Sequence, residues 1–308
     1  FFRFRQMSSE AVENDPALEA LREELRHSSV ASVEDDAEDL AELEATDLEG
    51  DLTPTELRWI VATRDAAQQA GFDCSCALLV QLANVTKGRT EKALRRLAKM
   101  KQWEEEPIVA NMTGTAAYKE ANDTASPKNR GFCAAVRRAK NSSLAFAADY
   151  GTYHPAGLRV PVGIKAVITT FENCCSSLAD VRRGVTIICN CNGVGYSNVS
   201  PAAELAMAKL YVEGYPVRIN RMVLVDVTLV ARVVLKAIRK VLPRKLNSRI
   251  HLLSGEELRD LFSQEALPCF LDGTNPPNAD EWWADLHARR EQWEAELAAK
   301  YGAGFSNI

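Results

Sequence analysis

The hydrophobic pattern is clearest between residues 184 and 251, where two short apolar runs flank a helical stretch. Val185–Cys189 and Met222–Val227 are rich in β-branched residues and have the length of buried strands. The stretch 202–212 between them has helical character, and Pro216 ends it because proline lacks an amide donor. Strand, helix and strand in this order predict a right-handed βαβ unit and a mostly parallel sheet.

The next segment, 229–242, has the period of an amphipathic helix. Its apolar stripe consists of Leu229, Val230, Val233, Val234, Ala237, Ile238, Val241 and Leu242. Basic residues fall between these positions: Arg232, Lys236, Arg239 and Lys240. A helix of this kind needs an apolar surface on which to bury its stripe.

Three helices are predicted upstream of the strands. Thr53–Glu56 combines a capping threonine, a proline in the first turn and a glutamate three residues after the cap, which indicates a helix start. A second helix is expected from Asp73 and a third over Thr90–Trp103. The segment Asn111–Asn129 is polar and predicts irregular structure.

Further elements are expected on both sides of the βαβ unit. Leu144–Asp149 has the pattern of a strand, and Val167–Asp180 that of a helix that leads into Val185. Ala279–Tyr301 predicts a charged helix that carries Trp282, Trp283 and Trp293. The expected organisation is an acidic, disordered leader over 1–52, a helical unit over 53–135, an α/β unit over 136–274 and a C-terminal helix over 275–308.

Charge is distributed unevenly along the chain. Residues 1–57 hold 17 acidic and 4 basic residues, so the rest of the chain carries a net +8 although the whole carries −5. The acidic composition of this leader predicts a solvated tail, or alternatively a tail that shields a basic surface from anionic membranes. The basic stretches lack interleaved aromatic residues and nucleic-acid motifs, so we expect no nucleic-acid partner.

Eight cysteines are few for a disulfide scaffold of 308 residues, and none has the spacing of a zinc knuckle. Free thiols and no metal site are expected.

No apolar run is long enough to span a bilayer. The six residues before Met7 are too short and too charged for a signal peptide, and they are interpreted as possible read-through ahead of a start at Met7.

Enzyme motifs are incomplete. Gly193 and Gly195 follow a strand, but the third glycine of a dinucleotide fingerprint is missing. Asp226 and His251 are candidates for acid or base chemistry, but no nucleophile elbow accompanies them. Asp226 alone is better interpreted as a residue whose carboxylate caps or hydrogen-bonds the next helix.

The order of these elements resembles the CRAL-TRIO lipid-binding family, which includes phosphatidylinositol-exchange, tocopherol-transfer and retinaldehyde-binding proteins. The matching text runs from Gly184-Val185-Thr186-Ile187-Ile188-Cys189-Asn190-Cys191-Asn192-Gly193 through Tyr215-Pro216-Val217-Arg218 to Lys245-Leu246-Asn247-Ser248-Arg249-Ile250-His251, and ends at Leu267-Pro268 and Asp272-Gly273. The resemblance covers about half the chain. It implies an α/β fold with a mostly parallel sheet flanked by helices, an apolar gate helix over a lipid cavity, and a small all-α domain before it.

The resemblance also implies site residues. The pocket and gate are expected to comprise Ile187, Cys189, Cys191, Val223, Val225, Leu229, Val230, Val233, Val234, Ala237 and Ile238. An anionic headgroup or membrane is expected to contact Arg218, Arg239, Lys245 and Arg249. One departure stands out, because Val80, Ala83 and Val85 occupy positions where the family's helical domain offers arginine. A neutral cargo is therefore expected somewhat more than phosphatidylinositol.

The predicted function is non-enzymatic binding and transfer of a hydrophobic lipid, enclosed between the sheet and the gate helix. Expected partners are a phospholipid, isoprenoid or sterol-like lipid and, transiently, an anionic membrane surface. We expect a cytoplasmic, peripheral monomer with no cofactor besides its lipid cargo. Two alternatives stay open: an interaction or membrane-sensing module with a vestigial pocket, and an α/β enzyme that uses Asp226 or His251.

Overall fold

The structure is a computed structural model that describes residues 48, 50–125, 133–136, 144–240, 242–274 and 279–306. Nearly all of the predicted acidic leader lies outside these residues. The helices are α4 (Pro54–Gln69), α5 (Cys76–Thr86), α6 (Thr90–Glu104), α7 (Gly114–Ala125), α8 (Val160–Cys174), α9 (Leu178–Arg183), α10 (Pro201–Lys209), α11 (Leu229–Arg239), α12 (Arg244–Asn247), α13 (Gly255–Leu261) and α14 (Ala279–Tyr301). A π-helical turn, η4 (Leu210–Gly214), continues α10.

The strands β1 (Cys133–Val136), β2 (Leu144–Asp149), β3 (Val185–Asn190), β4 (Ile219–Val225) and β5 (Ile250–Leu253) form one sheet of the described chain. Its spatial order is β1-β2-β3-β4-β5. β1 pairs with β2 antiparallel, and every other neighbour pair is parallel. The predicted α/β class with a mostly parallel sheet is thereby confirmed.

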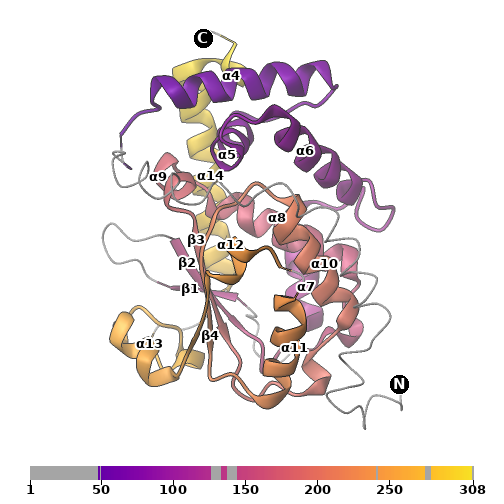
Figure 1. The fold of residues 1–308 in the computed structure, drawn as a ribbon, viewed down its shortest axis with the longest axis vertical. Coiled ribbons are helices and arrows are strands. Elements are labelled where there is room, and N and C mark those ends of the chain that lie inside the picture. The colour runs from indigo at the N-terminus through magenta and orange to yellow at the C-terminus, as the bar shows by residue number, and fades with distance from the viewer. Residues whose placement is uncertain are drawn as a thin grey trace.

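The two faces of the sheet carry different layers (Figure 1). Helices α7, α8, α10 and α11 lie on one face, where the main core gathers residues such as Phe146, Phe171 and Ile187. Helix α13 lies on the other face and covers a smaller core around Ile188 and Leu258. Both layers follow from the strand period of two, which sends successive side chains to opposite faces.

Helices α4, α5 and α6 form a separate bundle at one end of the molecule, and α14 runs from the sheet into it (Figure 1). The start of α4 has the predicted capping box, in which Thr53 and Glu56 satisfy each other's backbone amides. α14 joins both parts, because Trp283 stacks on Tyr118 and Trp293 lies in the core of the bundle. All three predicted tryptophans of α14 are buried.

Three expectations about helices need correction. α5 begins after Ser75, whose side chain accepts from the amide of Leu78, and not at Asp73. The polar segment 111–129 contains α7, because Ala117 and Tyr118 bury one face of it against the main core. α8 begins at Val160, ahead of the predicted start, and is separated from α9 by a break after Cys174.

Gly184 makes the tight turn from α9 into β3. Its φ is +77°, and a Cβ there would collide with the carbonyl oxygen of Arg218. Both the backbone angle and the lack of space therefore require glycine at this position.

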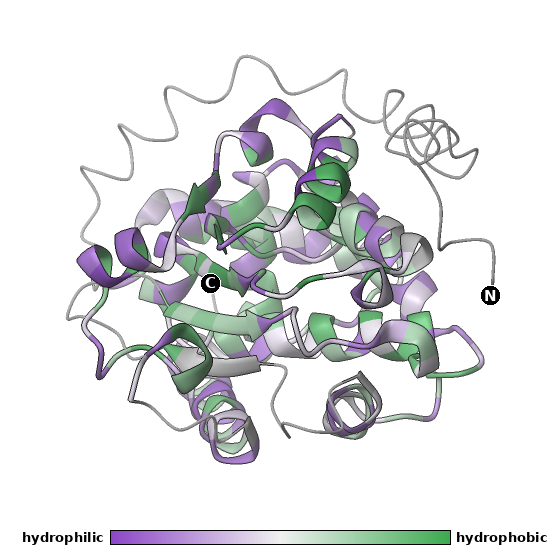
Figure 2. Ribbon diagram, turned by 90° about the horizontal axis from the view of Figure 1, so that it is seen from below, coloured by the Kyte–Doolittle hydropathy of each residue, from purple (hydrophilic) through white to green (hydrophobic). Residues whose placement is uncertain are grey.

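Hydrophobic residues concentrate in the strands and on the inward sides of the helices, while hydrophilic residues lie on the outer helices (Figure 2). Among the helices that the structure describes, none is long and apolar enough to cross a membrane.

Candidate functional site

A cavity lies on the main face of the sheet, between α8 and α10. Its volume is about 110 Å³. A single buried water needs only about 10–15 Å³, so the cavity has room for more than one water or for part of a lipid chain. Such unfilled space is unusual inside a protein, whose interior normally packs as densely as an organic crystal.

Six parts of the chain supply the walls. β2 and β3 form the floor with Phe146, Ala148 and Ile187, and α10 with the following turn forms one side with Ala203, Glu204, Met207 and Tyr211. α7 and α8 form the other side, and the loop after β2 closes one end. The remaining lining residues are Tyr118, Ala121, Asn122, Tyr150, Tyr153, Pro155, Leu158, Val160, Gly163, Ile164, Ala166, Val167, Thr170 and Phe171.

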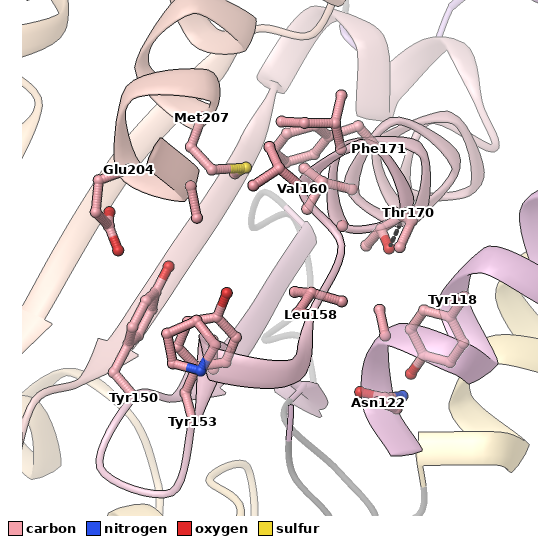
Figure 3. Close-up of a pocket in the computed structure, with 18 of the residues that line it drawn as sticks. Tyr118, Asn122, Tyr150, Tyr153, Leu158, Val160, Thr170, Phe171, Glu204 and Met207 are labelled. Carbon is pink, nitrogen blue, oxygen red and sulfur yellow. Dashed lines mark hydrogen bonds between the residues drawn. The ribbon is translucent and has the colours of Figure 1, made fainter. Parts of the chain in front are cut away.

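Apolar side chains dominate this lining, and most of its polar groups lie at two ends (Figure 3). Thr170, on α8, donates its hydroxyl to the carbonyl of Ala166. At one end the Glu204 carboxylate points toward the hydroxyl of Tyr150, with Tyr153 beside it. The rings of Tyr150 and Tyr153 meet edge to face, with centroids 5.9 Å apart. Tyr118 and Asn122 lie at the opposite end. None of the described side chains that line the cavity is basic.

The electrostatics of the Glu204 end follow from burial. Burial raises the pKa of the Glu204 carboxyl to about 7. It raises the pKa of Tyr150 and of Tyr153 above the ordinary value, and the neighbouring Glu204 carboxyl acts in the same direction. Burial, followed by Glu204 and Asp226, raises the pKa of the nearby Cys191 thiol to about 12. The two tyrosines and Cys191 therefore stay neutral at physiological pH, and Glu204 is the group here that changes charge.

The structure places the predicted strand residues on two different faces. Ile187 lines the cavity, and Cys189 and Cys191 belong to the same core. Val223 and Val225 instead face α13, and the prediction that they line the pocket is wrong. The pairing register explains this difference, because Ile187 is paired with Met222 and Ile188 with Val223. A register shift after Val185 decides which residues of β4 share the face of Ile187.

The predicted gate residues lie outside this lining. α11 packs on β4 and on α10, through Leu235 and Ile238 against Ala208 and Leu224. α11 therefore contacts α10, whose residues line the cavity, and contributes no described residue to that lining itself. Ala237 is buried, whereas Leu229 is 82% exposed beside the basic residues of the helix. Val230, Val233, Val234 and Ile238 are partly buried.

The four predicted basic residues come together around the first residues of β4 and β5. Arg249 Nη1 donates to the carbonyl of Ile219 at 2.6 Å, and Arg239 Nη2 donates to that of Ile250 at 3.2 Å. Burial, and then the nearby charge of Arg249, lower the pKa of Arg218 to about 10. Lys245 lies on α12, which leads into β5.

This cluster holds polar atoms without partners. The Nε atoms of Arg218 and Arg239 are buried and make no hydrogen bond within the described part of the chain. Arg218 and Arg249 repel each other, and Arg218 and Arg239 each keep an unused buried donor, so the cluster favours an anion.

The two residues considered for enzyme chemistry lie elsewhere. Asp226 has φ of +51°, and its Oδ1 accepts from the amide of Gly255 at 3.0 Å, which holds the start of α13. His251 is exposed on β5. Neither residue lines the cavity. In the described ranges, no group of three or more His, Cys, Asp or Glu side chains is placed to hold a metal ion.

Sequence reasoning missed the polar groups of the cavity. Glu204 lies in the first turn of α10, where an acidic residue is ordinarily explained by the helix dipole. The available signal was its position in the otherwise apolar stretch Ala202–Met207. Tyr150 and Tyr153 follow β2 in a turn, and only their three-dimensional approach to Glu204 marks them.

Of the comparisons with known proteins, the comparison with family models agrees with the motifs. A comparison with curated protein sequences finds no match. A solved structure titled "Crystal structure of Sfh5" is similar, with a TM-score of 0.49, 12% identity, and coverage of 93% of this chain and 97% of that chain. The family model of the CRAL/TRIO domain matches residues 128–273. Over residues 128–273, slightly less than half of the chain, the sequence is therefore similar to the CRAL/TRIO domain, as the ordered motifs indicated.

Proposed function

We propose that this protein is a non-enzymatic carrier of a neutral lipid, which it takes from a membrane and encloses on the main face of its sheet. The observation that carries the proposal is the apolar cavity between α8 and α10, which no described side chain fills. A cavity with such walls replaces the hydrocarbon of a bilayer as solvent. The lipid then keeps the roughly 0.8 kcal/mol that each CH₂ group gains by leaving water.

The choice of a neutral cargo rests on charge. None of the described lining residues is basic, and the carboxyl of Glu204 faces the interior. An anionic headgroup enclosed there would have no cation to offset its desolvation. The helical bundle supports the same choice, because Val80 and Ala83 are fully buried apolar residues where the family offers arginine.

An anionic membrane surface is the proposed site of exchange. Arg218, Arg239, Lys245 and Arg249 lie near the starts of β4 and β5, away from the cavity lining, and two of them have unused buried donors. Each basic residue near such a surface contributes about 1 kcal/mol. Helix α11 extends from this cluster, where Arg239 donates to the carbonyl of Ile250, to the exposed Leu229 in its first turn, and it offers an amphipathic contact. We place the protein at membrane surfaces as a peripheral, cytoplasmic monomer.

The interaction-module alternative is less favoured, because Trp282, Trp283 and Trp293 are buried against the rest of the chain. An enzyme that uses Asp226 or His251 is less favoured because neither side chain reaches the cavity.

The test is competitive loading from vesicles that contain phosphatidylcholine, phosphatidylinositol, cholesterol and farnesol, with the bound lipid identified by mass spectrometry. We expect neutral lipids to be enriched. Ala121→Trp, which fills the cavity from α7, should abolish loading, whereas Ala116→Trp on the exposed side of α7 should not. Equal loading of both variants, or enrichment of phosphatidylinositol, would contradict the proposal.

A further inference from the structure

The polar end of the cavity carries hydrogen-bonding groups that a purely apolar cargo would not use. Glu204, Tyr150 and Tyr153 come from two separate elements, α10 and the turn after β2, and bring one carboxyl and two hydroxyl groups to the same place (Figure 3). A simple container for hydrocarbon gains nothing from these groups. Each polar group that a bound lipid dehydrates without replacing its hydrogen bonds costs about 1–3 kcal/mol.

We infer that Glu204, Tyr150 and Tyr153 recognise a hydroxyl group at the end of a neutral, single-chain lipid. This inference rests on the proposed function, because it names the class of lipid that the cavity takes. The occupant would be a long-chain or isoprenoid alcohol, with its hydroxyl between Glu204 and the tyrosines and its chain along β2, β3 and α8.

Hydrogen-bonding capacity favours an alcohol over other neutral groups. A hydroxyl both donates and accepts. It donates to the carboxyl of Glu204 and accepts from a tyrosine hydroxyl, whichever protonation state Glu204 has. A hydrocarbon offers no hydrogen bond to any of these groups, and an ester or ether oxygen only accepts.

Charge disfavours an acid. A fatty acid bound with its carboxylate at this end would face Glu204, and no described lining residue offers a positive charge. Two carboxyl groups in one low-dielectric site share a proton or repel each other. A fatty amine would match an ionised Glu204, but the ammonium group must then be desolvated in a site whose other partners are neutral hydroxyls.

Size favours a single chain. At about 110 Å³ the cavity is smaller than most small-molecule sites, which measure roughly 300–1,000 Å³. So small a volume favours one chain over the two chains of a phospholipid.

The experiment uses the full chain and the neutral fluorophore diphenylhexatriene, whose emission rises in an apolar site. Four competitors share one twelve-carbon chain: 1-dodecanol, dodecanoate, dodecane and dodecylamine. We expect 1-dodecanol to displace the fluorophore at concentrations about tenfold lower than dodecane and dodecanoate, because the added hydrogen bonds are worth roughly that factor. Equal displacement by all four, or the tightest binding by dodecylamine, would overturn the inference.

Variants separate recognition from structure. Glu204→Leu should remove most of the preference for 1-dodecanol over dodecane. Glu204→Gln, which still hydrogen-bonds but carries no charge, should retain that preference and improve dodecanoate several-fold. Tyr150→Phe should weaken 1-dodecanol alone, and Glu91→Gln on the exposed side of α6 should change nothing. If Glu204→Leu and Glu204→Gln weaken all four competitors equally, Glu204 has only a structural role and the inference fails.

The same measurements keep the two proposals apart. Failure of the fluorophore to bind, or equal binding by Ala121→Trp, contradicts the carrier function and the inference with it. Binding that Ala121→Trp abolishes, combined with no discrimination among the competitors, leaves the carrier function standing and overturns only the choice of an alcohol.

Discussion

Glu56 and Arg182, which lie 126 residues apart in the chain, form a buried ion pair that fastens α4 to α9. Nε and Nη2 of Arg182 donate to the two carboxylate oxygens of Glu56 at 2.9 and 2.6 Å. Only 3% of the Arg182 side chain and 7% of the Glu56 side chain are exposed. Arg182 also donates to the carbonyls of Gly50 and Asp51, so it holds the chain that enters α4.

Breaking this pair should destabilise the fold strongly. Arg182→Met leaves the Glu56 carboxylate buried without its partner, and we expect the free energy of unfolding in urea to fall by about 3–5 kcal/mol. The matched control is Arg159→Met, which breaks an exposed pair with Glu120 and should cost less than about 1 kcal/mol. Similar losses in both variants would show that burial does not increase the contribution of the Glu56 pair to the free energy of unfolding.

The same pair predicts a dependence on acid. Burial opposes ionisation of Glu56, but hydrogen bonds from Arg182 and Thr53 prevail and lower its pKa below the ordinary 4.5. The stability that this carboxylate contributes is fully present above that ordinary value and is lost as pH falls through the lowered pKa. The advantage of the natural chain over Glu56→Gln should therefore be constant from pH 6 to 8 and shrink below pH 4.5. An advantage that is unchanged down to pH 3 would argue against the shift.

Glu204 predicts the opposite dependence. Its pKa is raised from 4.5 to about 7, so the empty folded protein resists an ionisation that the unfolded chain undergoes freely. Its cost to stability is absent below pH 4.5, develops as pH rises, and is complete above pH 7, at a magnitude of about 3 kcal/mol. Glu204→Gln should therefore gain stability over the natural chain between pH 5 and 8. The facing Tyr150, Tyr153 and Cys191 do not titrate in this range, so a flat difference would contradict the assignment.

Helix α14 supplies a cap from a distant part of the chain. The Glu294 carboxylate accepts from the amides of Cys76 and Ala77 at 2.6 and 2.9 Å, at the start of α5. Glu294→Ala should lower the free energy of unfolding by about 1 kcal/mol, because it removes both the acceptor and the favourable charge at a helix N-terminus. Glu296→Ala, exposed on the same helix, serves as the control and should have little effect. An equal loss in the two variants would exclude a capping role.

Membrane binding should depend on salt and on the basic cluster. Lys245→Gln combined with Arg249→Gln should weaken sedimentation with anionic vesicles several-fold at low salt, whereas Arg95→Gln on the exposed side of α6 should not. Removal of residues 1–47 should strengthen binding if the acidic leader shields this surface. The deletion stops there because the carbonyls of Leu48, Gly50 and Asp51 accept from Arg182. Binding that is insensitive to salt would contradict the electrostatic contact, and equal binding with and without the leader would show that the leader does not shield it.

Local signals determined much of the fold. The capping box at Thr53, the strand Leu144–Asp149 and the helix Ala279–Tyr301 lie where the pattern predicted them. These features depend on hydrogen bonds and side-chain periods within a few residues, which the sequence displays directly. α7 escaped prediction because its polar composition hides a narrow apolar face that becomes buried only against α8.

The cavity was decided by tertiary structure alone. The sequence by itself indicated the family and a mostly parallel sheet, together with an apolar face on which a lipid would lie. Which face of β4 joins that surface depends on the register between β3 and β4. The shift after Val185 pairs Ile187 with Met222 instead of Arg221, so Val223 lies on the opposite face. The approach of Glu204 to Tyr150 and Tyr153 arises from α10 and the turn after β2, more than fifty residues apart in the chain. A cavity is the space that packing leaves unfilled, so it depends on the volumes of side chains from many elements at once and on no local pattern.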